Sequence, residues 1–457
     1  MNRDTRIKKI QDVMKQDPFG KQEIPWEDAL QSMNVYKVPL EYLVYNKYNG
    51  RILSRTKSLE NQKHEIDVES ENGRKLIEKL LWDSKPIRNK QTLESIEKFG
   101  QEKVGIITRD GIIIDGNRRA MMLGRTDRYS YFKAVILPVT LEEKPIEIEK
   151  LETSYQMGED EKLGYNPIEK YLKASGLEKR GVSIVNIAKW MGEEETIIRE
   201  YLAVMKTMDD YLDYVGYGGI YTQLDGREDQ IIKLTQWLDN FYGEESAKAF
   251  DGYKNSDVDD LKMISFDYIR VVYNGQRFRN IAYGLKENHF FGDKKIWQDF
   301  RDFHFDHIEP IKDAEEKVDY DSENLEAHLN DRDNKFFEKG KNFLDENIDT
   351  HVQQLRYKQA ANQPLKLVNN AIGALEAIDR RHRAFSAPEV LERIENLNQT
   401  TVDMLQNKSP ERLLSQIVHL LESIKFGDGS SSKDELLKKI KEIEKIAYQL
   451  EKKVKDL

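Results

Sequence analysis

The sequence contains no cysteine among its 457 residues. That absence excludes disulfide bonds, thiol nucleophiles, iron–sulfur clusters and zinc sites built from thiolates. Long apolar runs are also missing, because no stretch approaches the roughly 18–20 apolar residues that a membrane-spanning helix needs. The first residues, MNRDTRIKKI, lack the apolar core of a signal peptide. We therefore expect a cytoplasmic protein without a membrane partner.

The charge balance is acidic, with 72 Lys and Arg against 82 Asp and Glu and a net charge of −10. This balance argues against a broadly basic nucleic-acid coat, although it leaves room for a local basic patch. Charged residues make up 34% of the chain, yet its 22 tyrosines and 10% aromatic content are too high for a disordered chain. The composition indicates a folded, mostly helical protein, and the length allows about two to four domains.

Patterning along the chain indicates five parts. Strand-like runs alternate with short helical runs in the second part, which predicts a small α/β domain, and helical periodicity dominates from there onward. The fold class that we expect is therefore α+β. The parts are a polar, partly helical leader at 1–35, the α/β domain at 36–140, a helical segment at 150–215, a mostly helical region of unknown role at 227–425 and a terminal helix at 434–457.

Local signals refine the α/β domain. Pro39 indicates that the strand predicted over 36–44 starts there or lies at a sheet edge. The charged run 57–73 predicts a surface loop. Arg109-Asp110-Gly111 separates two β-branched runs and predicts a hairpin. Gly124 predicts the end of a short helix that begins at Asn117.

The most informative motif is the run Ile112–Ala120, in which an apolar strand leads through Asp-Gly-Asn into two arginines and a new helix. Gly116 permits close approach of the backbone to an anion, and the helix start presents unpaired N–H groups. The guanidinium groups of Arg118 and Arg119 suit phosphate oxygens. This pattern is typical of a phosphate-binding turn.

An alternative interpretation of the motif needs no ligand. The run would be a hairpin turn that leads into a surface helix, with its arginines paired to Asp110 and Asp115. Residues 101–133 nevertheless carry seven basic side chains against four acidic ones, a positive patch in an acidic protein. The seven are Lys103, Arg109, Arg118, Arg119, Arg125, Arg128 and Lys133.

Three collinear stretches resemble the ParB family and its wider ParB/sulfiredoxin-like superfamily. They are VPLEYLVYNKYNGR, TLESIEKFGQEKVGIITRDGIIIDGNRRAMML and NPIEKYLKASGLEKRGVSIVNIAKWMG. The first resembles the family's opening strand and Asn-x-Arg segment, and the second its helix, central hairpin and Gly-x-Arg-Arg box. The third resembles its Asn-Pro-Ile-Glu helix and helix-turn-helix. The resemblance covers about residues 36–205 and implies a ParB/sulfiredoxin-like nucleotide-binding domain at 36–140 and a helix-turn-helix within 150–215.

In that family the Gly-x-Arg-Arg box binds the triphosphate of a nucleotide, usually CTP with a magnesium ion. A turn that contacts only the phosphates does not distinguish CTP from ATP, so either nucleotide is a candidate ligand. The absence of cysteine excludes the sulfinic acid reduction that sulfiredoxins catalyse. The resemblance implies nucleotide contacts from Gly100, Gln101, Gly116, Asn117, Arg118 and Arg119.

A third family box, a Glu-Asn pair ahead of the Asn-Pro-Ile-Glu helix, has Glu152 as its counterpart, although Thr153 follows in place of Asn. The resemblance implies a catalytic or magnesium-binding role for Glu152. This leaves an enzyme open, either a nuclease or a nucleoside triphosphatase acting on CTP or ATP. Another superfamily branch phosphorylates free serine with a glutamate base, which Glu152 would also permit.

The stretch Ser183–Gly192 fits the first helix and turn of a helix-turn-helix, with Ser183 as N-cap and Gly192 in the turn. The next helix, 193–202, would read base edges with its first turn, yet it opens with three glutamates that repel phosphates at close range. A structural element that docks a protein partner is the alternative. The candidates for DNA contact are Lys189, Thr196 and Arg199.

The terminal segment carries a heptad pattern. It follows the stretch FGDGSSSK at 426–433, which is a flexible linker by composition. We expect a short coiled coil that makes the chain a homo-oligomer, with packing of the helix on its own domain as the alternative. Apolar positions alternate steps of four and three through Leu436, Ile440, Ile443, Ala447, Leu450 and Val454.

Two weaker clusters favour ordinary structural roles. His304 and His307 are spaced for metal ligation but lack a further fixed ligand. Arg270, Arg277 and Arg279 lie among aromatic residues, a mixture that also suits nucleic-acid backbones.

The features together predict a ParB-like, nucleotide-dependent protein that associates with DNA, in a mobile-element or defence context. Nucleotide binding would switch a state that engages DNA or a protein partner. The alternatives are a nuclease or nucleoside triphosphatase that uses Glu152, and a protein adaptor whose nucleotide site is vestigial.

Overall fold

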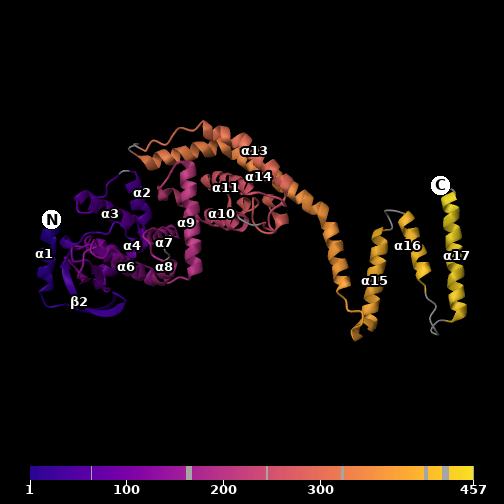
Figure 1. The fold of residues 1–457 in the computed structure, drawn as a ribbon, viewed down its shortest axis with the longest axis horizontal. Coiled ribbons are helices and arrows are strands. Elements are labelled where there is room, and N and C mark those ends of the chain that lie inside the picture. Colours follow the sequence, from indigo (N-terminus) through magenta and orange to yellow (C-terminus); the bar gives the residue numbers. More distant parts are fainter. Residues whose placement is uncertain are drawn as a thin grey trace. The chain divides into compact units, whose positions relative to one another are not determined.

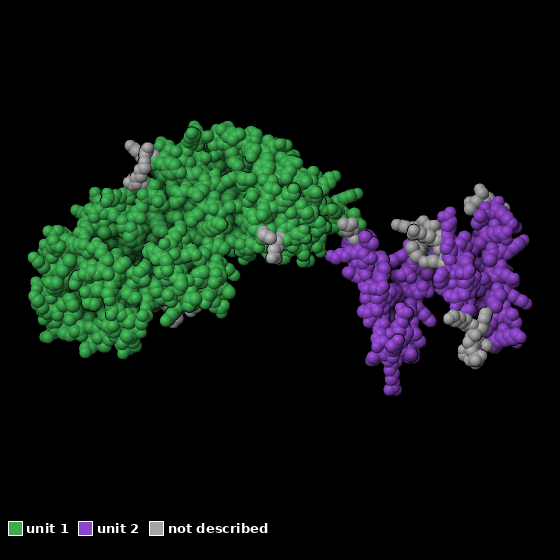
Figure 2. Space-filling view, viewed as in Figure 1, with its two compact units in different colours: residues 1–362 green, residues 363–457 purple. Residues whose placement is uncertain are grey.

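The computed structural model describes residues 1–62, 64–160, 167–242, 245–320, 324–405, 410–424 and 432–455. Figure 1 shows the elements along the chain, and Figure 2 shows its two compact units, residues 1–362 and 363–457. The fold is mixed α+β, as predicted, because the described strands all lie in the N-terminal region of the first unit and helices follow. Among the described residues, no helix has both the length and the apolar character that a membrane span requires.

Within the described residues, five strands form one mixed sheet. Its order is β1-β2-β5-β3-β4, and neighbours are antiparallel except for β3 and β5, which are parallel. The predicted hairpin is confirmed between β3 and β4, where the Gly111 N–H donates to the Thr108 carbonyl. The strands are β1 (Gly20–Trp26), β2 (Ala29–Pro39), β3 (Gly105–Ile107), β4 (Ile113–Asp115) and β5 (Tyr131–Ile136).

The first 35 residues belong to the sheet domain, contrary to the prediction of a leader. They hold β1, most of β2 and α1 (Arg3–Met14), which buries Ile10 in the core of the sheet. Only Ile24 and Trp26 of β1 are buried, so the alternation that marks a strand is missing from its polar first half. Pro39 ends an interior strand rather than lying at a sheet edge.

Helices cover both faces of the sheet, as the alternation of side chains along strands requires. They are α2 (Leu53–Asn61), α3 (Glu71–Asp83), α4 (Pro86–Phe99), α5 (Asn117–Leu123) and α6 (Pro145–Asp160). Residues of α3, α4 and α5 share a core with Tyr36 and Phe132, and Ile148 and Leu151 of α6 pack with Val135 on the opposite face. The predicted bounds of α5, with Gly124 as its C-cap, are confirmed.

The surface loop predicted over 57–73 is wrong at both ends, because α2 runs to Asn61 and α3 starts at Glu71. Three of the four buried residues of α2 are polar. Thr56 and Ser58 are both buried and donate their hydroxyls to carbonyls one turn earlier. Apolar periodicity therefore could not reveal this helix.

The rest of the first unit is helical. It buries a large core that includes Trp237, Phe266, Trp297 and Phe300. The division between the two units falls within α14. The elements are α7 (Pro167–Lys179), α8 (Ile184–Met191), α9 (Glu195–Val215), η2 (Tyr221–Leu224), α10 (Glu228–Phe241), α11 (Asn255–Arg270), α12 (Gly275–Phe278), α13 (Lys294–Asp313) and α14 (Leu325–Glu376).

The second unit continues with α15 (Pro388–Leu405), α16 (Pro410–Ser423) and α17 (Lys433–Lys455). None of its described residues is buried. The helix predicted at 434–457 is confirmed over the described residues as α17. Most of the linker predicted at 426–433 lies outside the described residues.

Candidate nucleotide-binding site

The turn at Gly116 connects β4 to α5. Gly116 has a φ of 100°, in the left-handed region that favours glycine. A Cβ at this position would lie 2.7 Å from Cζ of Phe132, so a side chain has no room. Backbone conformation and packing thus require glycine here, whether or not an anion binds.

Arg118 and Arg119 lie in the first turn of α5, and both are half-buried. Arg118 donates from Nη2 to Oγ1 of Thr92 on α4 at 3.2 Å. Arg119 forms an ion pair with Asp115 at the end of β4, as the ligand-free alternative predicted. Its Nε, however, is buried without an acceptor among the described residues. An unsatisfied buried donor costs about 1–3 kcal/mol, so the protein satisfies this guanidinium only in part.

The other ion pair of that alternative is not formed as predicted. Asp110 lies 3.0 Å from Arg3 of α1, and it accepts the hydroxyl of Thr108 at 2.6 Å. Elsewhere in the basic stretch, Arg109 pairs with Glu143 at 2.6 Å. The surrounding positive patch is therefore partly neutralised by carboxylates of the same domain.

Asn117 begins a chain of buried polar contacts that leads from the turn to α7. Its Oδ1 accepts the backbone N–H of Asn46 at 2.9 Å. Nδ2 of Asn46 donates to Oε1 of Glu152 on α6 at 3.2 Å, and Oε2 of Glu152 lies 3.4 Å from Nζ of Lys173 on α7. All four side chains belong to residues that are buried. The fold thus connects the Gly-Asn-Arg-Arg turn to Glu152 through Asn46, which lies in the first ParB-like stretch but was not predicted as a site residue.

Glu152 is buried and forms an ion pair inside the fold. Its carboxylate faces the buried ammonium group of Lys173, which also lies 3.3 Å from Glu149. The described residues contain no group of three or more His, Cys, Asp or Glu side chains that could hold a metal ion. Magnesium in nucleotide sites is held largely by phosphates, water and one or two carboxylates. The protein groups described here do not form a magnesium site by themselves.

Gly100 and Gln101 lie at the end of α4. Gly100 caps the helix with a φ of 74°, in the left-handed region that favours glycine. The buried amide of Gln101 bonds to the backbone, with Nε2 donating to the carbonyls of Lys103 and Lys133 and Oε1 accepting the N–H of Lys133. These bonds tie the end of α4 to β5, which gives Gln101 a structural role without a ligand.

The helices α8 and α9 occupy the segment predicted to contact DNA. Oγ of Ser183 accepts the N–H of Asn186, so the predicted N-cap is confirmed, and Gly192 ends α8 with a φ of 70°. The following helix is longer than predicted, because α9 continues to Val215 and buries Met208 and other apolar residues in the core of the helical region.

The candidate DNA contacts Lys189, Thr196 and Arg199 are all exposed. Arg199 lies 4.0 Å from Glu195 one turn earlier. Of the three glutamates at 193–195, Glu193 is turned inward, where it pairs with Lys170 at 3.0 Å and accepts the hydroxyl of Tyr201 at 3.1 Å. Only two of the three carboxylates are therefore positioned to repel phosphates.

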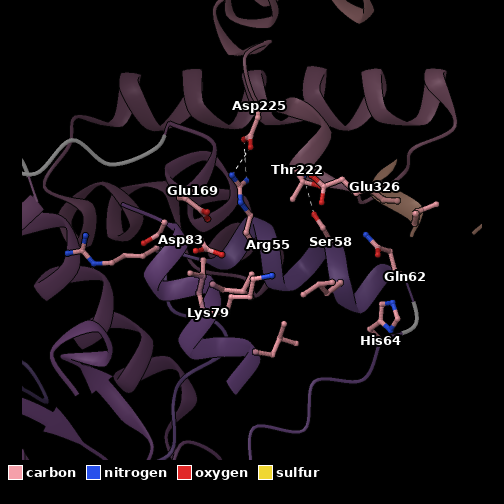
Figure 3. A pocket seen from close by; sticks show the side chains of 18 of the residues that line it. Arg55, Ser58, Gln62, His64, Lys79, Asp83, Glu169, Thr222, Asp225 and Glu326 are labelled. Carbon is pink, nitrogen blue, oxygen red and sulfur yellow. Dashed lines mark hydrogen bonds and ion pairs between the residues drawn. The ribbon is translucent and has the colours of Figure 1, made fainter. Parts of the chain in front are cut away.

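A separate cavity of about 570 Å³ lies in the first unit, lined by residues of α2, α3, α7, the η2 region and the start of α14 (Figure 3). None of the predicted nucleotide contacts lines it. Across it, Arg55 of α2 forms a two-pronged ion pair with Asp225 at 2.6 and 3.2 Å. These partners are separated by 170 residues, so no local pattern could have predicted the cavity.

Glu169 of α7 forms part of the cavity wall. Its carboxylate accepts the N–H of Ser54 at 3.0 Å and the hydroxyl of Ser54 at 2.6 Å. Burial raises the pKa of Glu169 to about 7, although the two hydrogen bonds from Ser54 act in the opposite direction. A carboxyl group that titrates near neutral pH thus lies between α2 and α7.

The two weaker clusters are structural. His304 is buried with Nε2 3.0 Å from Asp267, and neither it nor His307 belongs to a possible metal group among the described residues. Arg270 is buried and pairs with Asp333 at 2.8 Å, and Arg277 pairs with Asp345. These arginines are bound by carboxylates of the helical region.

No family model matches this chain, and no curated protein matches it either. The fold and the candidate site therefore identify a structural class and no particular family. It is a mixed α+β protein with a five-stranded sheet, in which a Gly-Asn-Arg-Arg turn opens a short helix. The particular activity is a matter for proposal.

Proposed function

We propose that this chain is a ParB-like, nucleotide-dependent protein that associates with DNA, and that Gly116, Arg118 and Arg119 bind the phosphates of CTP or ATP. Nucleotide binding at this turn switches the protein between states that engage DNA or a protein partner. A mobile-element or defence context suits this activity better than chromosome segregation, since the helix that would read DNA begins with acidic residues.

The observation that carries the proposal is the incomplete satisfaction of Arg119. Its guanidinium lies in the first turn of α5 beside Gly116, and its Nε lacks an acceptor among the described residues. A phosphate oxygen would supply a charged acceptor once the side chain turned away from Asp115. The same first turn carries Arg118, whose guanidinium donates to Thr92 of α4, so the turn holds a second planar donor group.

The switch is supported by the buried chain from Asn117 through Asn46 and Glu152 to Lys173. A shift of the turn on binding would move Asn117, and buried hydrogen bonds resist being broken because each unsatisfied partner loses its solvation. The movement is therefore passed to α6 and α7. Through α7 it reaches the neighbouring α9, which carries Thr196 and Arg199.

A nuclease or nucleoside triphosphatase based on Glu152 is the less favoured function. The carboxylate is buried and faces the ammonium group of Lys173, which keeps it away from a substrate. A magnesium ion bound with the nucleotide would supply charge compensation for the phosphates.

Calorimetric titration with CTP, ATP, GTP and UTP, with and without Mg²⁺ and DNA, tests the proposal. We expect micromolar binding of one nucleotide and a change in DNA affinity when it is bound. Product analysis after long incubation separates the alternatives, because hydrolysis of nucleotide or DNA would favour the enzyme. Binding of no nucleotide under any condition would leave the adaptor as the remaining function and overturn the proposed site.

A further inference from the structure

The cavity beside α2 lies between the sheet domain and the helical region of the first unit (Figure 3). Its volume of about 570 Å³ falls within the roughly 300–1,000 Å³ that is usual for small-molecule sites, and such sites occur preferentially where domains meet. Protein interiors are otherwise close-packed. A space of this size inside one compact unit is therefore a candidate ligand site.

The two sides of this cavity carry charges of opposite sign. On the side of the sheet domain, basic residues outnumber the one acidic residue among the described lining, Asp83. The basic residues there are Arg51, Arg55, Lys79 and Lys85, with His64 beside them. The charged residues described on the side of the helical region are Glu169, Asp225 and Glu326, which are all acidic. A ligand that spans the cavity thus meets positive charge at one end and negative charge at the other.

The ion pair between Arg55 and Asp225 crosses from one side to the other. Its two side chains are 34% and 44% exposed, and ion pairs that water reaches contribute little to stability. A ligand with one anionic and one cationic group could therefore exchange this internal pair for two pairs of its own. A carboxylate matches the planar guanidinium of Arg55, and an ammonium group matches the carboxylate of Asp225.

Lys79 and Glu326 add a second charge at each end. Both are exposed, and the side chain of neither forms an ion pair or a hydrogen bond with another described residue. Lys79 lies on the same side as Arg55, and Glu326 on the same side as Asp225. Glu169 is different, because its carboxylate already accepts two hydrogen bonds from Ser54.

Aliphatic side chains complete much of the lining. They come from both sides of the cavity, so the body of a ligand would contact apolar groups of both. Transfer of apolar surface from water to such a lining is favourable. These residues are Ile52, Leu59, Leu76, Leu80, Ile220 and Leu325.

We propose that the cavity beside α2 binds a small zwitterion with an apolar body, of the chemical class of the aliphatic amino acids. Its carboxylate pairs with Arg55 and Lys79, and its ammonium group pairs with Asp225. The bound molecule bridges the sheet domain and the helical region. This inference does not depend on the proposed nucleotide site, because none of the predicted nucleotide contacts lines the cavity.

Melting of the full chain in the presence of leucine, isoleucine or valine tests the site. A ligand that binds only the folded state raises the melting temperature in proportion to its occupancy. We expect a rise that depends on the concentration of at least one of these amino acids. No rise with any of the three would overturn the proposal.

Two analogues of leucine test the need for both charges. Isocaproate keeps the apolar body and the carboxylate, and isoamylamine keeps the apolar body and the ammonium group. Calorimetric titration should show each to bind about tenfold more weakly than leucine or worse, because a charge-assisted contact is lost at one end. An analogue that binds as tightly as leucine would show that the site takes a singly charged ligand and would overturn the proposal.

Variants of α3 test the contact with the carboxylate. Lys79→Gln should weaken leucine binding by about tenfold, since it removes one charged partner. Lys75→Gln is the matched control, because Lys75 is an exposed lysine of the same helix that pairs with Glu71 and does not line the cavity. It should bind leucine as wild type does. Nucleotide affinity should be unchanged in both variants, so failure of this site is distinguishable from failure of the turn. Equal leucine affinity in wild type and Lys79→Gln would exclude the contact.

Asp225→Asn tests the other end of the ligand. The change removes the partner of the ammonium group and releases Arg55 from its ion pair. The variant should therefore bind isocaproate more tightly than wild type does and should lose the preference for leucine over isocaproate. An undiminished preference for leucine would exclude Asp225 as the partner of the ammonium group.

Discussion

Arg119 is the residue in the candidate site with the least complete set of partners, since its ion pair with Asp115 leaves Nε without an acceptor among the described residues. Arg119→Ala should therefore lower nucleotide affinity tenfold or more by calorimetry, because a charge-assisted hydrogen bond contributes about 1.5–3 kcal/mol. Arg118→Ala should have a similar effect. Arg128→Ala serves as control, since Arg128 donates to the carbonyl of Glu97 at the far end of the basic stretch. Unchanged affinity in both test variants, with unchanged melting, would exclude the turn as a phosphate site.

Glu169 makes stability depend on pH. Its pKa is raised from 4.5 to about 7 by burial, so the folded chain binds this proton more tightly than the unfolded chain does. Its contribution is complete below pH 4.5 and is lost as pH rises through 7. Glu169→Gln keeps an acceptor for the N–H of Ser54 and removes the charge, so the variant should melt higher than wild type at pH 8 and similarly at pH 5.

The matched control for this change is Glu178→Gln, which alters an exposed glutamate of the same helix. It should not change the pH dependence of melting. If Glu169→Gln and wild type lose the same stability between pH 5 and pH 8, the carboxyl group of Glu169 does not titrate in that range.

At the scale of elements, α8 and α9 give a test of DNA contact. Glu194→Gln with Glu195→Gln removes two exposed carboxylates near the start of α9, which should raise DNA affinity for all sequences if this helix faces phosphates. Lys189→Ala and Arg199→Ala should each weaken binding and reduce the salt slope by about one unit. The salt dependence of DNA affinity measures both effects. Identical slopes in all variants would mean that α9 serves as a docking element.

Glu193 provides the contrast within the same helix start. Because it pairs with Lys170 and Tyr201, Glu193→Gln should lower stability and leave DNA affinity unchanged. A rise in DNA affinity from this change alone would indicate that Glu193 faces outward when DNA is bound.

Elements with local signals could be predicted, and elements held by distant contacts could not. The bounds of α5 follow from the strand before Gly116 and the stop at Gly124, and the start of α8 follows from the cap at Ser183. The strand β1 lacks a local signal because five of its seven residues are exposed, and it is held by pairing with β2. In α2 the only apolar buried residue is Leu53, and the other three carry hydroxyl groups, so apolar periodicity does not indicate a helix there.

For the molecule as a whole, local signals could predict the arginine turn, whereas the cavity beside α2 depends on distant contacts. The arginines of the turn are adjacent in sequence, so their gathering in one place could be predicted. The link from Asn46 to Glu152 spans 106 residues, and the cavity joins α2 to Asp225. Such contacts depend on how the sheet domain and the helical region pack, which no spacing in the sequence encodes.

The link through Asn46 supplies a test of coupling across the first unit. Asn46→Ala removes the hydrogen bond to Glu152 but keeps the backbone N–H that Asn117 accepts, so the turn itself retains its partner. Nucleotide affinity should therefore stay within about threefold of wild type, whereas the change in DNA affinity on nucleotide binding should shrink, because energetic coupling between two sites is lost when the contact that carries it is cut. DNA titrations with and without saturating nucleotide measure this coupling. Asn240→Ala is the control, because Asn240 is exposed and donates to the carbonyl of Gln236 within its own helix. Full coupling in the Asn46 variant would show that the signal travels by another route, while loss of nucleotide binding itself would show that Asn46 holds the turn in shape.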